Sequence, residues 1–85
     1  MPMLMEDRTF QIADIYVPMA RRQTLDPETV SEIAASILEE GQRTPIQVRP
    51  DGARYVLVEG LHRLEACKAL GETTIVGVIV QAKRK

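Results

Sequence analysis

Apolar and polar residues alternate in four short stretches of the chain, which predicts strands there. The first is a strand or extended segment over 9–17, and the last is a β-branched strand over 74–80. Between them, runs at 45–50 and 54–59 flank Asp51-Gly52. Glycine readily adopts the positive φ of a tight turn, so we expect a β-hairpin here. The alternating apolar residues of the first stretch are Phe10, Ile12, Ile15 and Val17.

A helical period predicts one helix from Asp26 to about Glu40. Asp26 can cap free amides, Pro27 suits the first helical position, and Glu28 favours the positive end of the helix dipole. Gly41 is a typical C-terminal stop. One apolar face, expected to join the core, consists of Val30, Ile33, Ala34, Ile37 and Leu38.

A second helix is expected after Gly60, ending at Gly71. Its apolar positions are Leu61, Leu64, Cys67, Ala69 and Leu70. Residues 19–25 are expected to be a connection. The order strand, helix, strand, strand, helix, strand predicts an α/β (α+β) fold: a small mixed sheet with two main helices packed on it. The chain is expected to be one domain, residues 1–85, with tails at 1–8 and 82–85.

Composition narrows the class of protein. Apolar residues are 45% of the chain and charged residues 27%, which indicates a folded domain. The formal net charge of -1 lacks the basic excess of a domain that holds a nucleic-acid duplex alone. Arg21-Arg22 and Lys83-Arg84-Lys85 are local basic clusters, interpreted as solvated surface or as a weak nucleic-acid contact. A single cysteine and no long apolar run or signal-peptide pattern favour the cytoplasm and exclude a membrane span.

The segment 56–66 reads as a strand that turns through Gly60 into a helix beginning with Leu61-His62-Arg63. A helix start has free amides and a positive dipole end, so cations there suggest a bound anion, such as phosphate. Arg63 can grip phosphate oxygens and His62 can add charge. Glu59 is a weak candidate for a catalytic residue, a metal ligand or a group that orients Arg63. The alternative is a plain turn in which Arg63 pairs with Glu59 or Glu65.

Almost the whole chain resembles the N-terminal domain family of ParB, the chromosome and plasmid partition proteins of bacteria. The matching segments, in the family's order and at about its spacing, are Leu25-Asp26, 32–37, Gly41, 44–49 and 55–66. Sulfiredoxins are similar through the first helix and through Gly60-Leu61-His62-Arg63.

The resemblance implies a ParB/sulfiredoxin fold with a nucleotide pocket, in which Gly60, Leu61, His62 and Arg63 hold the phosphates of CTP or ATP, with Mg²⁺ suspected. Thr44, Pro45 and Arg49 would lie beside the pocket. The first helix would present Thr29, Glu32 and Ser36 to it, although the Ser36 hydroxyl can equally bond back to its own helix.

Departures from the family pattern limit the chemistry. Partition proteins usually have Glu-Arg-Arg after the glycine, so His62 puts triphosphate hydrolysis in doubt. Sulfiredoxins carry their reactive cysteine where this chain has Leu61, which argues against reductase activity. Cys67, one turn further on, is expected in the core. The fold's serine kinases carry a glutamate near the place of Arg21 and Arg22, and only Glu59 or Asp14 could replace it here.

The leading hypothesis is therefore a nucleotide- or phosphate-binding module linked to DNA partition or transcription regulation. One alternative is a protein- or DNA-interaction module with a vestigial pocket, and another is a nucleotide-dependent small-metabolite kinase. The 85 residues leave no room for a helix-turn-helix DNA reader or a C-terminal dimerisation domain. DNA contact would then come through additional domains or a partner protein, and a homodimer is a further possibility.

Overall fold

The computed structural model describes residues 6–42 and 44–80 and contains one five-stranded mixed sheet with three α-helices. The strands are β1 (Arg8–Gln11), β2 (Ile15–Tyr16), β3 (Ile46–Asp51), β4 (Arg54–Glu59) and β5 (Thr74–Ile79). The helices are α1 (Met19–Arg22), α2 (Pro27–Glu40) and α3 (Leu61–Ala69), with a 3₁₀ turn at Ile12–Asp14. The predicted fold class is confirmed.

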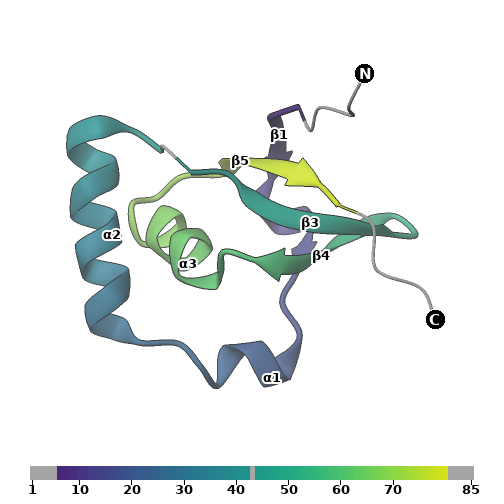
Figure 1. Ribbon diagram of the computed structural model, residues 1–85, viewed down its shortest axis with the longest axis horizontal. Coiled ribbons are helices and arrows are strands. Elements are labelled where there is room, and N and C mark those ends of the chain that lie inside the picture. Colours follow the sequence, from purple (N-terminus) through teal and green to yellow (C-terminus); the bar gives the residue numbers. More distant parts are fainter. Residues whose placement is uncertain (1–5, 43, 81–85) are drawn as a thin grey trace.

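The sheet order is β1-β5-β3-β4-β2. β3 pairs antiparallel with β4 and parallel with β5, while β1 is antiparallel to β5 and β2 is parallel to β4. The hairpin forms as predicted, with Gly52 at φ 63°. Figure 1 shows α3 beside the central strands and α2 on the far side of α3.

The prediction of one strand or extended segment over residues 9–17 is wrong. Arg8–Gln11 and Ile15–Tyr16 are separate strands at opposite edges of the sheet, and the 3₁₀ turn Ile12–Asp14 lies between them. The alternation of apolar and polar residues over 9–17 is imperfect because this segment contains two strands and a turn. β1 also begins at Arg8, so that residue belongs to the sheet and not to the expected tail. Of the other expected tail residues, Glu6 and Asp7 are exposed and precede β1, whereas 1–5 and 82–85, including the basic cluster at 83–85, lie outside the described residues.

The expected connection at residues 19–25 contains the short helix α1, which has no buried residue. Figure 1 shows α1 at the edge of the molecule, in the connection between β2 and α2. None of the helices in the described ranges combines the length and hydropathy needed to cross a bilayer.

Helix α2 has the predicted ends. The Asp26 side chain accepts a hydrogen bond from the Glu28 amide, and Gly41 ends the helix at φ 79°. The expectation that its apolar face covers part of the sheet is corrected, because α2 packs mainly on α3, while Ile37 still packs against the core. No α2 residue is fully buried, and Leu38 is 75% exposed. A helix covered on one flank by a single neighbour can bury only part of a broad apolar face.

The core lies between α3 and the central strands. Leu64 of α3 and Val48 of β3 are completely buried, and Leu61 and Cys67 are also in the core, as predicted. Ala69, by contrast, is exposed, and Ala66 is the alanine of α3 that is buried. Burying Leu64 and its neighbours stabilises the contact that fixes the start of α3 against β3.

A glutamine side chain completes the sheet where a strand residue is missing. The Val76 amide donates to Gln42 Oε1 at 2.9 Å, and Gln42 Nε2 donates to the Val76 carbonyl at 2.8 Å. β3 first pairs with β5 at Ile46 and Gly77, so the next residue back is Pro45, which has no amide hydrogen. The amide of Gln42 therefore takes the place of a backbone peptide beside Val76.

We expect Gln42→Ala to lower the free energy of unfolding by about 1 kcal/mol, since Val76 would lose both partners at a half-buried position. Urea unfolding followed by circular dichroism measures the change. Gln23→Ala is the matched control, because the side chain of Gln23 is exposed on the surface after α1. An equal effect of the two substitutions would contradict the assignment of this role to Gln42.

Candidate functional site

The turn between β4 and α3 requires a glycine. Gly60 has φ 109° and ψ 28°, a region that other residues rarely adopt. A Cβ at this residue would lie 2.6 Å from Cγ2 and 3.2 Å from Cα of Ile46. β4 also has a bulge just before the turn, since Gln47 pairs with Glu59 but Val48 pairs with Leu57. The bulge and the close approach of β3 together fix where α3 begins.

The first turn of α3 presents backbone donors. Its first backbone bond runs from the Leu64 amide to the Gly60 carbonyl at 2.9 Å. The amides of Leu61, His62 and Arg63 precede this bond and have no acceptor within the helix. Gly60 provides no side-chain cap. These three amides and the positive end of the helix dipole are suited to an anion.

A hollow of about 320 Å³ opens beside this turn. Two cations reach it from different elements, Arg21 from α1 and Arg63 from α3. The basic pair at 21–22 was predicted as a surface cluster, but Arg22 lines a separate hollow with Tyr16, Leu25 and Lys68. The residues that line the hollow beside the turn are Arg21, Thr24, Ile33, Glu59, Gly60, Leu61, His62 and Arg63.

The hollow carries a net positive charge. Within residues 6–42 and 44–80, neither Arg21 nor Arg63 forms an ion pair, and Glu59 is the carboxylate that lines the same space. Glu65, considered as a partner for Arg63, instead lies 3.3 Å from Lys68 Nζ. Both guanidinium groups therefore remain available to an anionic ligand.

His62 is engaged with the other helix. Its Nε2 accepts a hydrogen bond from the Asp26 amide at 2.9 Å. The proton of this neutral imidazole is consequently on Nδ1. The Asp26 carboxylate in turn accepts from the Glu28 amide at 3.2 Å and from the Thr29 hydroxyl at 2.8 Å. The starts of α2 and α3 are thus tied together, and while the tie exists Nε2 of His62 cannot donate to a phosphate.

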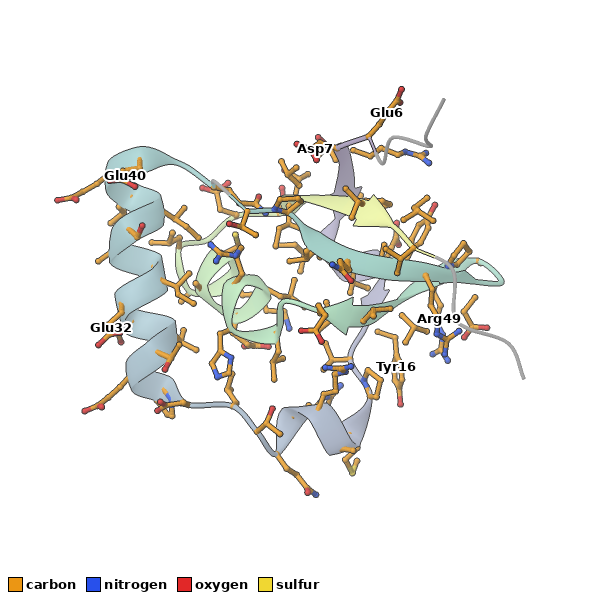
Figure 2. All side chains as sticks on the ribbon, in the orientation of Figure 1. Glu6, Asp7, Tyr16, Glu32, Glu40 and Arg49 are labelled. Atoms are coloured by element: carbon orange, nitrogen blue, oxygen red, sulfur yellow. The ribbon has the colours of Figure 1, made fainter. Side chains whose placement is uncertain are left out.

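The other residues that the resemblance placed near the pocket do not line this hollow. Arg49 lies toward the hairpin end of β3, separated from Tyr16 by Val56 of β4. Glu32 points away from α3 (Figure 2). Ser36 is exposed on α2, and Thr44 is exposed where its carbonyl accepts from Gln42 Nε2 at 3.1 Å. The Thr29 hydroxyl donates to the carboxylate of Asp26, the residue that caps α2, and Pro45 is half-buried next to Ile46.

Cys67, and Leu61 at the place where the resemblance puts the cysteine of sulfiredoxins, are both in the core. The Leu61 side chain is 7% exposed, so this residue can offer a ligand its backbone amide alone. Cys67 is 3% exposed, as predicted. Burial raises the pKa of the Cys67 thiol, the charge of Glu72 raises it further, and Arg63 opposes the increase.

We expect Cys67 to react with a thiol reagent far more slowly in the native protein than in urea. Because its pKa is raised in the folded state, its contribution to stability is present below the unfolded pKa, about 8.5, and is lost as the pH rises through the folded pKa. The free energy of unfolding should therefore fall above pH about 8.5, and less so in Cys67→Ala. Equal reaction rates in native and unfolded protein would contradict this prediction.

Metal binding would depend on Glu59. This side chain is exposed, and in the described part of the chain no three His, Cys, Asp or Glu side chains gather as a metal site. Asp14, the other carboxylate considered for catalysis, is exposed in the 3₁₀ turn and does not line the hollow. One carboxylate suits a Mg²⁺ ion that arrives on nucleotide phosphates, since Mg²⁺ uses one or two carboxylates there.

Sequence reasoning missed the side chains that approach the turn from elsewhere. The turn is bordered by Ile46 from β3, Ile33 from α2 and Thr24 after α1. The backbone amide of Asp26 binds His62, which lies 36 residues further along the chain. The sequence around Asp26 predicted that its side chain caps α2. No local pattern indicates that the backbone amide of Asp26 bonds to His62.

Comparisons with known proteins match the chain to one domain family. The model of the ParB N-terminal domain matches residues 6–85. A probable chromosome-partitioning protein ParB of Campylobacter jejuni is 39% identical over 62 residues, which are 73% of this chain and 22% of that protein. The chain thus spans about a fifth of the length of this curated relative.

Solved structures agree with this result. Sulfiredoxin from Arabidopsis thaliana superposes with a TM-score of 0.81 and 30% identity, covering 91% of this chain and 86% of its own. ParB from Caulobacter crescentus complexed with CTP-gamma-S superposes with a TM-score of 0.78 and 27% identity. The match covers 92% of this chain and 46% of that chain. The same protein complexed to the centromeric parS site superposes with a TM-score of 0.75 and 26% identity. That match covers 89% of this chain and 41% of that chain.

Proposed function

Because this chain belongs to the ParB N-terminal domain family, we propose that its turn from Glu59 to Arg63 binds the phosphates of a nucleoside triphosphate. The observation that carries the proposal is the meeting, at one hollow, of three uncapped amides and two guanidinium groups that form no ion pair with any described residue. CTP is the first candidate, because a ParB of the same fold is complexed with CTP-gamma-S. ATP is the second.

The residues of the turn have distinct roles in this proposal. Gly60 allows the backbone to approach the phosphates, and the amides that follow donate to their oxygens. Arg63 can bind two oxygens at once through its planar guanidinium group. Arg21 faces the ligand from α1 and balances the remaining charge. Glu59 is the residue that would contact a Mg²⁺ ion on the nucleotide.

The wider role follows from the family. We propose that the domain serves chromosome partitioning in the cytoplasm, with DNA such as the parS site of the Caulobacter protein recognised by parts beyond this domain. The separation of Arg21 from Arg22 argues against a shared basic surface for DNA, because the two residues line different hollows. Homodimerisation stays a prediction.

Calorimetric titration with CTP, ATP, GTP and UTP, each with and without Mg²⁺, tests the proposal. We expect saturable binding of CTP or ATP. If the folded protein shows no binding of any of the four, nucleotide binding is wrong. A DNA shift that weakens steeply with salt but is unchanged by nucleotide would favour the interaction module instead. Turnover that requires an added hydroxyl acceptor would favour the kinase.

A further inference from the structure

The hydrogen bond between His62 Nε2 and the Asp26 amide assigns His62 a role other than phosphate contact. We propose that His62 is a positioning residue that holds the connection between α1 and α2 against the start of α3, and that it does so only while its imidazole is neutral. Its consequence for ligand affinity rests on the proposed nucleotide site, but the tie itself is a property of the protein alone.

The hydrogen bond between His62 and Asp26 affects where Arg21 lies in the hollow. Asp26 follows α1 closely, and the chain between them is held in a turn, because the Thr24 amide and hydroxyl both donate to the Arg21 carbonyl at 3.0 and 2.7 Å. Arg21 and Thr24 line the hollow. α1 has no buried residue, so few other contacts fix its place. Anchoring Asp26 on α3 therefore keeps Arg21 opposite Arg63.

Protonation is incompatible with this contact. A protonated imidazole is a donor at both nitrogens, and Nε2 would then face the Asp26 amide donor at 2.9 Å. The charged groups around His62 are Arg21 from α1, Glu59 at the end of β4, Asp26 before α2, and Arg63 on its own helix. Protonation of the imidazole should therefore open the tie.

This role and phosphate contact predict opposite effects of pH. A histidine that grips phosphate binds nucleotide more tightly when it is protonated, because it gains a positive charge. A histidine that holds Asp26 loses its contact on protonation, and Arg21 is then no longer held opposite Arg63 at the nucleotide site. The sign of the pH dependence therefore distinguishes the two roles.

The binding experiment uses the full chain with CTP and Mg²⁺ between pH 5.5 and 7.5, and compares wild type with His62→Gln and His62→Phe. Glutamine carries an acceptor near the place of Nε2 but does not titrate, whereas phenylalanine has no acceptor. Titration of the ligand's own phosphates cancels in the ratio of wild-type to His62→Gln affinity. We expect this ratio to be near one at pH 7.5 and to fall by about threefold to tenfold at pH 5.5.

His62→Phe should bind more weakly than His62→Gln at every pH in this range. A ratio that rises on acidification, or equal affinities of the two variants, would overturn the proposal and favour direct phosphate contact or no role.

A second experiment needs no nucleotide. In ¹⁵N NMR spectra of the free protein, the Asp26 amide signal should shift as the pH falls from 7.5 to 5.5, and its protection factor, the intrinsic exchange rate at each pH divided by the observed rate, should decrease. In His62→Gln neither should change. The imidazole should be the Nδ1-protonated tautomer at pH 7.5. An Asp26 amide that is unchanged in wild type would overturn the tie even if CTP binds, and a change specific to wild type would support it even if CTP does not.

Discussion

Replacing Gly60 with alanine is expected to lower the free energy of unfolding by about 2–5 kcal/mol, and nucleotide binding should be lost with the geometry of the turn. The left-handed backbone accounts for roughly 1–2 kcal/mol. Overpacking against β3 accounts for another 1–3 kcal/mol or so. The new Cβ would lie 2.6 Å from Ile46 Cγ2 and 2.9 Å from its Cβ, and Ile46 is itself only 1% exposed. Small domains are often only about 5 kcal/mol stable, so the variant would be largely unfolded.

Two other glycines separate these contributions. Gly71 has φ 81° with nothing within 4 Å of an added Cβ, so Gly71→Ala isolates the backbone strain. Gly77→Ala isolates the packing clash, since its Cβ would lie 2.9 Å from Ile46 Cγ1 without a positive φ. In urea unfolding, the midpoint of Gly60→Ala should be lower than the midpoints of Gly71→Ala and Gly77→Ala. A midpoint equal to that of Gly71→Ala would show that the contact with Ile46 is unimportant.

Replacing Arg63 with alanine is expected to weaken nucleotide binding about 10- to 150-fold, the effect of losing a charged hydrogen bond of about 1.5–3 kcal/mol. Arg63 is half-buried beside the uncapped amides, and neither Glu59 nor Glu65 pairs with it. Arg63→Lys should keep the charge but lose bidentate contact, giving an intermediate affinity. Calorimetry with the tightest-binding nucleotide measures both variants.

Arg22→Ala is the matched control for Arg63→Ala. It removes the same charge from a separate hollow that Arg22 lines, so nucleotide affinity should change little. An equal loss in both variants would indicate general attraction between the protein and the nucleotide and would contradict a specific role of Arg63. Circular dichroism should confirm that each variant is folded.

Local chemistry in the sequence determined where most elements begin and end. Asp26, Pro27 and Gly41 delimit α2 at the predicted residues, and Gly52 and Gly71 adopt the positive φ that their turns require. Each of these features depends on atoms within a few residues of chain, so the sequence pattern contains the whole cause. Gly60 was identified as a turn for the same reason.

Only the tertiary structure decided which of these elements meet. Whether residues 9–17 form one strand or two depends on which sheet edges are free, and the burial of α2 depends on its packing against α3. Likewise, Arg21 joins Arg63 because α1 lies beside the turn, and His62 binds an amide 36 residues away. The sequence alone thus determined the local turn that offers amides to an anion. The cations around it and the tie that holds them depend on long-range contacts, which no local pattern encodes.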